Sequence, residues 1–162
     1  MVPTPFDCDF GFLYQTYEFP ADLNGEWEDP ILQPQRSLSN ENGVVVRVVD
    51  FPPKTKTRFH RTVSLDFGII FEGEMSCYLD NGVELTMRRG DVCVQRGTMH
   101  GWENKSDKPA RIYFVLTGKY FLVAIVTNML IIYVAAKPVS LGGKLLTNAG
   151  FNAKDEAKLA EK

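Results

Sequence analysis

The feature that most constrains this chain is a series of short strand-like runs between residues 43 and 117, separated by turn signals. The runs are rich in β-branched and aromatic residues, which favour strands over helices. Asp80-Asn81-Gly82 is the strongest hairpin signal, because Asn and Gly tolerate the positive φ angles of a type I′ turn. Short strands with a turn about every ten residues predict an all-β barrel or sandwich. We expect strands at 43–51, 65–71, 75–79, 83–87, 92–95, 100–104 and 110–117.

Two segments of different character flank this core. Residues 1–42 are rich in Pro, Asn, Asp and Glu with weak periodicity, which predicts a mostly irregular N-terminal arm lying on the domain. Residues 136–162 form a tail with a charged, Ala-rich end. The length of 162 residues and the ordinary content of 44% hydrophobic and 23% charged residues predict one globular domain.

Charge and cysteine usage exclude some partners and favour one compartment. The formal net charge is −2 and the core has no block of Lys and Arg, which predicts no nucleic-acid partner. The three cysteines, Cys8, Cys77 and Cys93, have no disulfide-framework spacing, and the last two lie in apolar runs. Buried thiols and the absence of a signal-like N-terminus predict a cytoplasmic protein.

An apolar insertion at 118–135 separates the core from the tail. Its run at 120–136 approaches the ~20 apolar residues that a membrane-spanning helix needs, so we expect a helix with a membrane contact as one option. The other, which we favour, is a translated retained intron. Gly118-Lys119-Tyr120 can be encoded with a 5′ splice consensus, Thr127-Asn128 with a branch point, and Val134-Ala135 with a terminal AG. Splicing there would remove 17 codons in frame and leave one Ala in place of 118–135.

The two histidines of the chain, His60 and His100, lie in two recognisable stretches. The first reads His-Arg-Thr-Val-Ser-Leu-Asp from residue 60, and the second reads Gln-Arg-Gly-Thr-Met-His-Gly-Trp-Glu-Asn from residue 95. With Gly90-Asp91 before the second stretch, they resemble the two motifs of the cupin family over residues 43–117, in order and spacing. The resemblance is to small single-domain cupins of fungal secondary metabolism, and implies a jelly-roll antiparallel β-barrel.

In such a barrel, His60, Asp66 and His100 are expected to meet in the mouth as the catalytic residues. Two imidazoles and a carboxylate also form a facial triad suited to a divalent metal, with Fe, Mn or Zn as candidates. The chain departs from the usual metal cupin, because Thr62 replaces the second His and Asp66 replaces a Glu. The residues expected to contact a small-molecule substrate are Thr62, Ser64, Gln95, Trp102 and Tyr113.

Three functions are open at this stage. The first is an oxidoreductase, metal-dependent, that acts on a polyketide-like or aromatic secondary-metabolite intermediate. The second is a metal-free lyase or isomerase, a decarboxylase or dehydratase, with a histidine as general acid or base. The third is a non-catalytic binding module, because a fold alone does not fix function. A homodimer is also expected, with 44–49 as an edge strand that pairs with a second copy.

Overall fold

The computed structural model describes residues 2–3, 6–33, 38–118, 122–126, 129–133, 140–141 and 144–145, with side chains for 6–33 and 38–118. Its main body is built from antiparallel strands, and the only helical element among these residues is a short 3₁₀ turn, η1 (Pro30–Leu32). The all-β prediction is therefore confirmed. No helix in the described part of the chain is long and apolar enough to cross a membrane.

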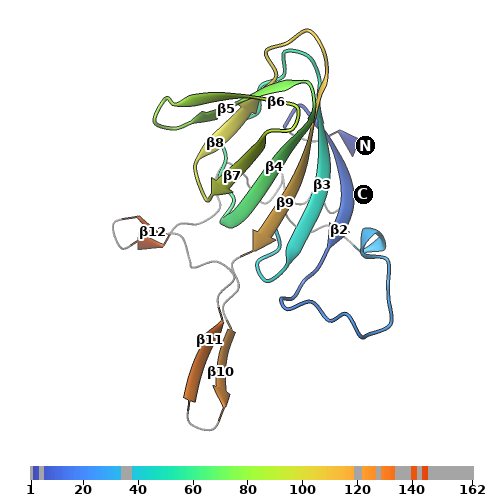
Figure 1. Ribbon diagram of the computed structural model, residues 1–162, viewed down its shortest axis with the longest axis vertical. Coiled ribbons are helices and arrows are strands. Elements are labelled where there is room, and N and C mark those ends of the chain that lie inside the picture. The colour runs from blue at the N-terminus through green and yellow to red at the C-terminus, as the bar shows by residue number, and fades with distance from the viewer. Residues whose placement is uncertain are drawn as a thin grey trace.

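Two antiparallel sheets form the barrel (Figure 1). The larger has the strand order β1-β2-β3-β9-β4-β7, and the smaller has the order β6-β5-β8. The bounds of the strands are β1 Val2–Pro3, β2 Asp9–Gln15, β3 Val44–Phe51, β4 Ser64–Glu72, β5 Glu74–Leu79, β6 Glu84–Arg88, β7 Val92–Arg96, β8 His100–Glu103 and β9 Ala110–Gly118. The seven strands predicted from the sequence all form, within a residue or two of their expected ends.

Alternation along each strand places one face of each sheet in the core. In β9, Ile112, Phe114 and Leu116 are buried, and Ile112 lies between Val49 of β3 and Ile70 of β4. Gly68 of β4 lies directly opposite Phe114, and a Cβ there would come within 3.0 Å of the Phe114 ring. A side chain at this position would therefore require the Phe114 ring to shift.

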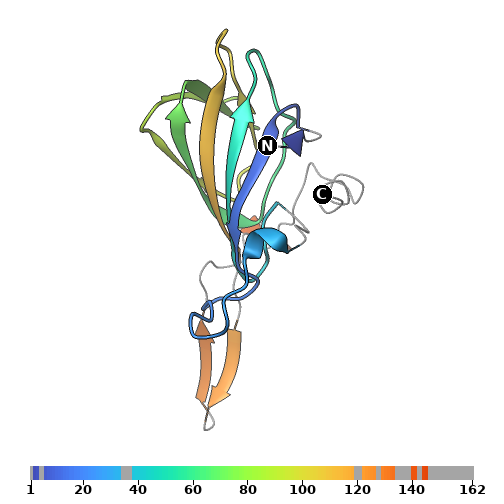
Figure 2. The same cartoon turned by 90° about the vertical axis from the view of Figure 1, so that its right-hand side faces the viewer.

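The N-terminal arm is more ordered than its composition predicts. Strand β2 pairs with β3 along its length, from Asp9 opposite Asp50 to Gln15 opposite Val45 (Figure 2). The prediction of a mostly irregular arm is wrong at β2. Pairing with β3 satisfies the backbone hydrogen bonds of this segment, and its weak local sequence pattern does not indicate that pairing. It also makes β3 an internal strand, so 44–49 is not an edge that could pair with a second copy.

Two local predictions also need correction. The hairpin at Asp80-Asn81-Gly82 forms, but only Gly82 has a positive φ, of 83°, so the turn is not type I′. Instead, Gly82 N–H donates to Leu79 O, and Gly82 provides the left-handed residue that follows the turn. The expected apolar helix at 118–135 is replaced by a hairpin of β10 (Leu122–Val126) and β11 (Met129–Tyr133), which pair only with each other among the described residues.

Candidate active site

A cavity opens between the sheets and the N-terminal arm, with about 510 Å³ of unfilled space including its mouth. Its walls are mainly apolar and aromatic, and its polar groups come from four strands and the segment before β4. The lining residues are Phe6, Cys8, Phe10, Leu38, Arg47, Val49, Phe51, Thr57, His60, Thr62, Asp66, Gln95, His100, Trp102, Phe114 and Leu116. A mostly apolar cavity with a few convergent polar groups is typical of a small-molecule site.

His60 and His100 meet because their backbones form an antiparallel bridge. His60 N donates to His100 O at 2.8 Å, and His100 N donates to His60 O at 2.9 Å. Residues paired in this way direct their side chains to the same side of the ladder. The two imidazole ring centroids lie 4.3 Å apart, which confirms that the two distant histidines share one cavity.

Backbone carbonyls orient both imidazoles. Nδ1 of His60 lies 3.0 Å from Arg58 O, and Nδ1 of His100 lies 3.0 Å from Thr98 O. A carbonyl only accepts hydrogen bonds, so Nδ1 is the protonated nitrogen in each ring and Nε2 carries the lone pair. The site therefore presents two neutral proton acceptors of the same tautomer.

Burial keeps these imidazoles neutral. It lowers the pKa of His100 from 6.5 to about 3, and repulsion from a protonated His60 acts in the same direction. Burial also lowers the pKa of His60. At neutral pH neither ring carries a charge, and the lowered pKa makes each imidazole a weaker base than an exposed histidine.

Asp66 lies on β4, directly opposite Gln95 of β7, and is 2% exposed. Its Oδ2 accepts a hydrogen bond of 2.7 Å from the Thr62 hydroxyl. Burial raises the pKa of Asp66 from 3.8 to about 6, although the Thr62 hydrogen bond and the Arg47 charge favour the ionised form. Asp66 is thus a carboxyl group whose protonation changes close to neutral pH.

The structure adds Arg47, a cavity residue that the sequence analysis did not select. It is 3% exposed on β3, its Nη2 donates to Leu38 O at 2.5 Å, and its guanidinium lies 5.2 Å from the centre of the Phe10 ring. Burial lowers the pKa of Arg47 to about 10, which leaves it charged at neutral pH. The sequence signal that could have identified Arg47 as a cavity residue is its alternation with Val45 and Val49, which lie on the same side of β3.

The predicted substrate-contacting residues divide into two groups. Thr62, Gln95 and Trp102 line the cavity, and Trp102 packs edge-on against Phe114 at 5.5 Å between ring centroids. Ser64 is buried but is not one of the lining residues. Tyr113 is also outside the cavity, because alternation in β9 turns it to the other face, where it contacts Phe71. The expectation for Tyr113 is therefore not met by its position.

His60, Asp66 and His100 are of the donor types that bind divalent metals. Both histidines have the Nδ1–carbonyl hydrogen bond that is common in metal-binding imidazoles. In the parts of the chain with described side chains, however, no group of three or more His, Cys, Asp and Glu is arranged to hold one ion. The side chains present thus fall short of a three-ligand centre, and His60, Asp66 and His100 as metal ligands stay a prediction.

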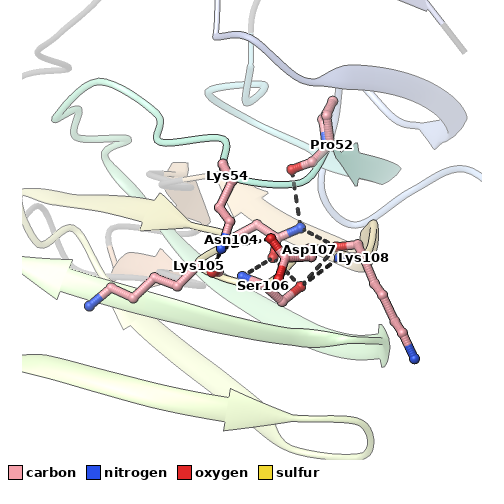
Figure 3. Close-up of polar contacts among 7 residues, drawn as sticks. All are labelled: Pro52, Lys54, Asn104, Lys105, Ser106, Asp107 and Lys108. Carbon is pink, nitrogen blue, oxygen red and sulfur yellow. Dashed lines mark hydrogen bonds and ion pairs between the residues drawn. The ribbon is translucent and has the colours of Figure 1, made fainter.

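Asn104 follows β8 directly and is the centre of a hydrogen-bond network (Figure 3). It is fully buried, and its Nδ2 lies 3.1 Å from Phe51 O, 3.1 Å from Pro52 O and 2.8 Å from Lys108 O. Its Oδ1 accepts from the Ser106 backbone and hydroxyl. These bonds join the end of β3 to the turn after β8 and so hold the strand that carries His100 and Trp102.

Comparison with known families agrees with the fold and the motifs. A family model described as "Cupin domain" matches residues 47–116. The chain is 37% identical over 127 residues to Oryzines biosynthesis cluster protein J of Aspergillus oryzae, which covers 74% of this chain and 70% of that protein. The chain belongs to the cupin family.

Other relatives have names that state an activity. This cupin is 40% identical over 108 residues to the cupin-domain-containing oxidoreductase virC of Hypocrea virens, covering 64% of this chain and 56% of the relative. The chain thus spans little more than half the length of that relative. Among solved structures, the Schizosaccharomyces pombe Cnp3 cupin domain matches with a TM-score of 0.49 and 13% identity, over 72% of this chain and 69% of that one.

Proposed function

We propose that this cupin is an enzyme that transforms a small secondary-metabolite intermediate, polyketide-like or aromatic, inside the barrel. The relatives named as oxidoreductases, and those named for biosynthesis clusters, support this substrate class and favour an oxidoreductase. The aromatic walls formed by Phe10, Trp102 and Phe114 suit a planar or unsaturated substrate.

The observation that carries the proposal is the pair of neutral imidazoles at the cavity wall. With Nδ1 held by carbonyls, the Nε2 atoms of His60 and His100 are the groups that can take a proton from a bound substrate. Asp66 and Thr62 form the second polar group of the cavity, and Gln95 lies opposite Asp66. A substrate between these groups would be held by hydrogen bonds while a histidine moves its proton.

A second candidate is a metal-independent lyase or isomerase. It is favoured by the arrangement of the donors, because the described side chains supply two adjacent imidazoles without a third ligand beside them. Proton transfer by His60 or His100 is enough for a decarboxylation, dehydration or isomerisation. An oxidation, by contrast, needs an electron acceptor, which a divalent Fe or Mn ion with dioxygen would supply when bound.

Turnover of candidate intermediates, measured with and without metal, tests both proposals. The purified protein is assayed after chelation and after addition of Fe(II), Mn(II) or Zn(II), with His100→Ala and the control Tyr113→Phe, whose ring lies outside the cavity. Metal-dependent oxidation that is lost in His100→Ala supports the oxidoreductase, and turnover that survives chelation supports the lyase or isomerase. Saturable binding with no turnover under any condition would contradict both and leave a binding module.

A further inference from the structure

We propose that Cys77 and Cys93 form an oxidation site, at which a hydroperoxide joins the two thiols as a reversible disulfide between the two sheets of the barrel. The inference goes beyond the proposed function, because neither thiol lines the cavity. Both are free thiols, Cys77 on β5 of the smaller sheet and Cys93 on β7 of the larger sheet. The observation that carries the proposal is that the inward side of β7 contacts the Cys77 sulfur across the space between the sheets.

Alternation along β7 directs Cys93 into the barrel. Val92 and Val94, on the outer side of the strand, are 55% and 53% exposed, whereas Gln95, on the same side as Cys93, is buried. Cys93 itself is half-buried and packs against the core cluster that contains Cys77. Because Cys77 is only 3% exposed, a dissolved oxidant reaches the pair from the Cys93 side.

The contacts between β5 and β7 bring the two sulfur atoms together. Gln95 Nε2 donates to Cys77 Sγ at 3.8 Å, which places this sulfur against the inward side of β7, where Cys93 also lies. The Cys77 and Cys93 thiols also form a hydrogen bond with each other. Two cysteines can be bridged only when their side chains already approach each other, because the geometry of a disulfide is narrow. The fold therefore supplies the approach that this bond needs.

The two thiols differ in reactivity. Their hydrogen bond lowers the pKa of Cys93, whereas the same bond, together with burial, raises the pKa of Cys77. The thiolate is the form of cysteine that attacks an oxidant, and oxidation follows thiolate character and exposure. Cys93 is thus the thiol that reacts first, and the buried Cys77 is the thiol that resolves its oxidised form.

The oxidation takes place in two steps. The Cys93 thiolate attacks one oxygen of hydrogen peroxide, so that an S–O bond forms, the O–O bond breaks and hydroxide leaves with the proton that Cys93 had lost, as water. The Cys77 sulfur then attacks the sulfenic sulfur of Cys93, which forms the S–S bond and breaks the S–O bond. The departing hydroxide takes the Cys77 proton and leaves as a second water. The two thiols together lose two electrons and two protons, and the peroxide is reduced to two waters.

Peptide mapping of the unchanged protein tests the proposal and needs no variant. The folded full-length chain is treated with a small excess of hydrogen peroxide, its remaining thiols are alkylated, and it is digested with trypsin, which cuts between Cys77 and Cys93 at Arg88 and Arg89. We expect mass spectrometry to find the Cys77 and Cys93 peptides joined, with two hydrogen atoms lost. Dithiothreitol should separate them again, and Cys8 should be recovered as an alkylated thiol.

Two variants and one stability measurement complete the test. Cys93→Ser should abolish the joined peptide, whereas Cys8→Ser, the matched control, should retain it. The oxidised protein should unfold about 4 °C or more above the reduced one, because the cross-link restricts the unfolded chain, and dithiothreitol should reverse this rise.

The pattern of products distinguishes the fold from chance pairing. In urea, where the fold no longer holds Cys77 against β7, peroxide should give mixed pairs that include Cys8. The same mixture from the folded protein would overturn the proposal. So would oxidation of Cys93 to a sulfinic acid while Cys77 stays a free thiol, because the second sulfur would then not be in reach.

Discussion

At the scale of single residues, the site depends on side chains whose neighbours fix their position and charge. His60 and His100 are oriented by carbonyls two residues earlier in the chain, and Asp66 is held by Thr62. Asn104 is not part of the cavity, yet it links three carbonyls around the end of β8. The chemistry and the stability of this region are therefore tied to a few buried polar groups.

Asn104→Ala should lower the free energy of unfolding by about 3 kcal/mol, because it leaves several buried backbone groups without their partner. Urea denaturation followed by circular dichroism measures this loss. Lys108→Ala is the matched control, since Lys108 takes part in the network through its backbone groups, which the substitution keeps. Equal effects of the two substitutions would contradict the role assigned to Asn104.

The buried histidines should make the metal-free protein sensitive to acid. The unfolded chain takes up a proton at His100 below pH 6.5, but the folded chain does so only near pH 3, so stability is lost as pH falls from about 6.5 to 3. The contribution of His100 is roughly 5 kcal/mol at most. Unfolding free energies measured at several pH values in chelator should therefore show a flatter acid slope in His100→Gln.

Asp66 acts in the opposite direction and provides the control. Its pKa is raised from 3.8 to about 6 in the folded state, so its ionisation removes stability as pH rises through that window. In Asp66→Asn this opposing contribution disappears, and the loss of stability on acidification should become steeper. A parallel change of slope in the two variants would contradict the assignments.

At the scale of elements, the strand β2 and the loop before it complete the site. Phe6 and Phe10 stack at 5.9 Å between ring centroids, both line the cavity, and Phe10 lies beside the Arg47 guanidinium. The arm thus supplies one wall of the barrel. Because β3 is internal, the predicted homodimer would have to use another surface and stays a prediction.

Phe6→Ala should therefore lower the free energy of unfolding by about 3 kcal/mol, because the Phe6 ring is 3% exposed and its loss leaves a cavity in the wall. Thermal and urea unfolding measure the effect. The aromatic control Trp27→Ala removes a side chain that is 76% exposed and should change stability by less than about 1 kcal/mol. If the arm were a loose attachment, Phe6→Ala would be as mild as the control.

At the scale of the whole molecule, the barrel and the β10–β11 hairpin are separate sheets (Figure 1). In the part of the chain that the structure describes, the hairpin adds no strand to either sheet of the barrel, and a two-stranded hairpin on its own is marginally stable. This arrangement agrees with a segment that the barrel does not need. The retained-intron hypothesis itself stays a prediction, and a genomic sequence without GTAAGT at codon 118 would end it.

Removing residues 119–135 and keeping Gly118, the last residue of β9, should leave the unfolding temperature of the barrel unchanged within about 3 °C, because no barrel strand pairs with the hairpin among the described residues. It should also reduce self-association, because the removed run is strongly apolar. Calorimetry and light scattering of the two proteins measure these effects. A barrel that no longer unfolds cooperatively would show that the segment is part of the fold.

The sequence by itself determined the seven core strands, the all-β class and the pair His60 and His100, because alternation and turn chemistry are local and the two motifs stand in a fixed order. The tertiary structure alone decided that β2 joins the sheet, that Arg47 lines the cavity and that Tyr113 does not. Strand pairing and burial depend on neighbours far along the chain. The burial of Arg47, a charged residue within a β-branched run, becomes evident only when the rest of the barrel covers β3. The same long-range packing sets the pKa of Asp66 and His100, which no local pattern contains.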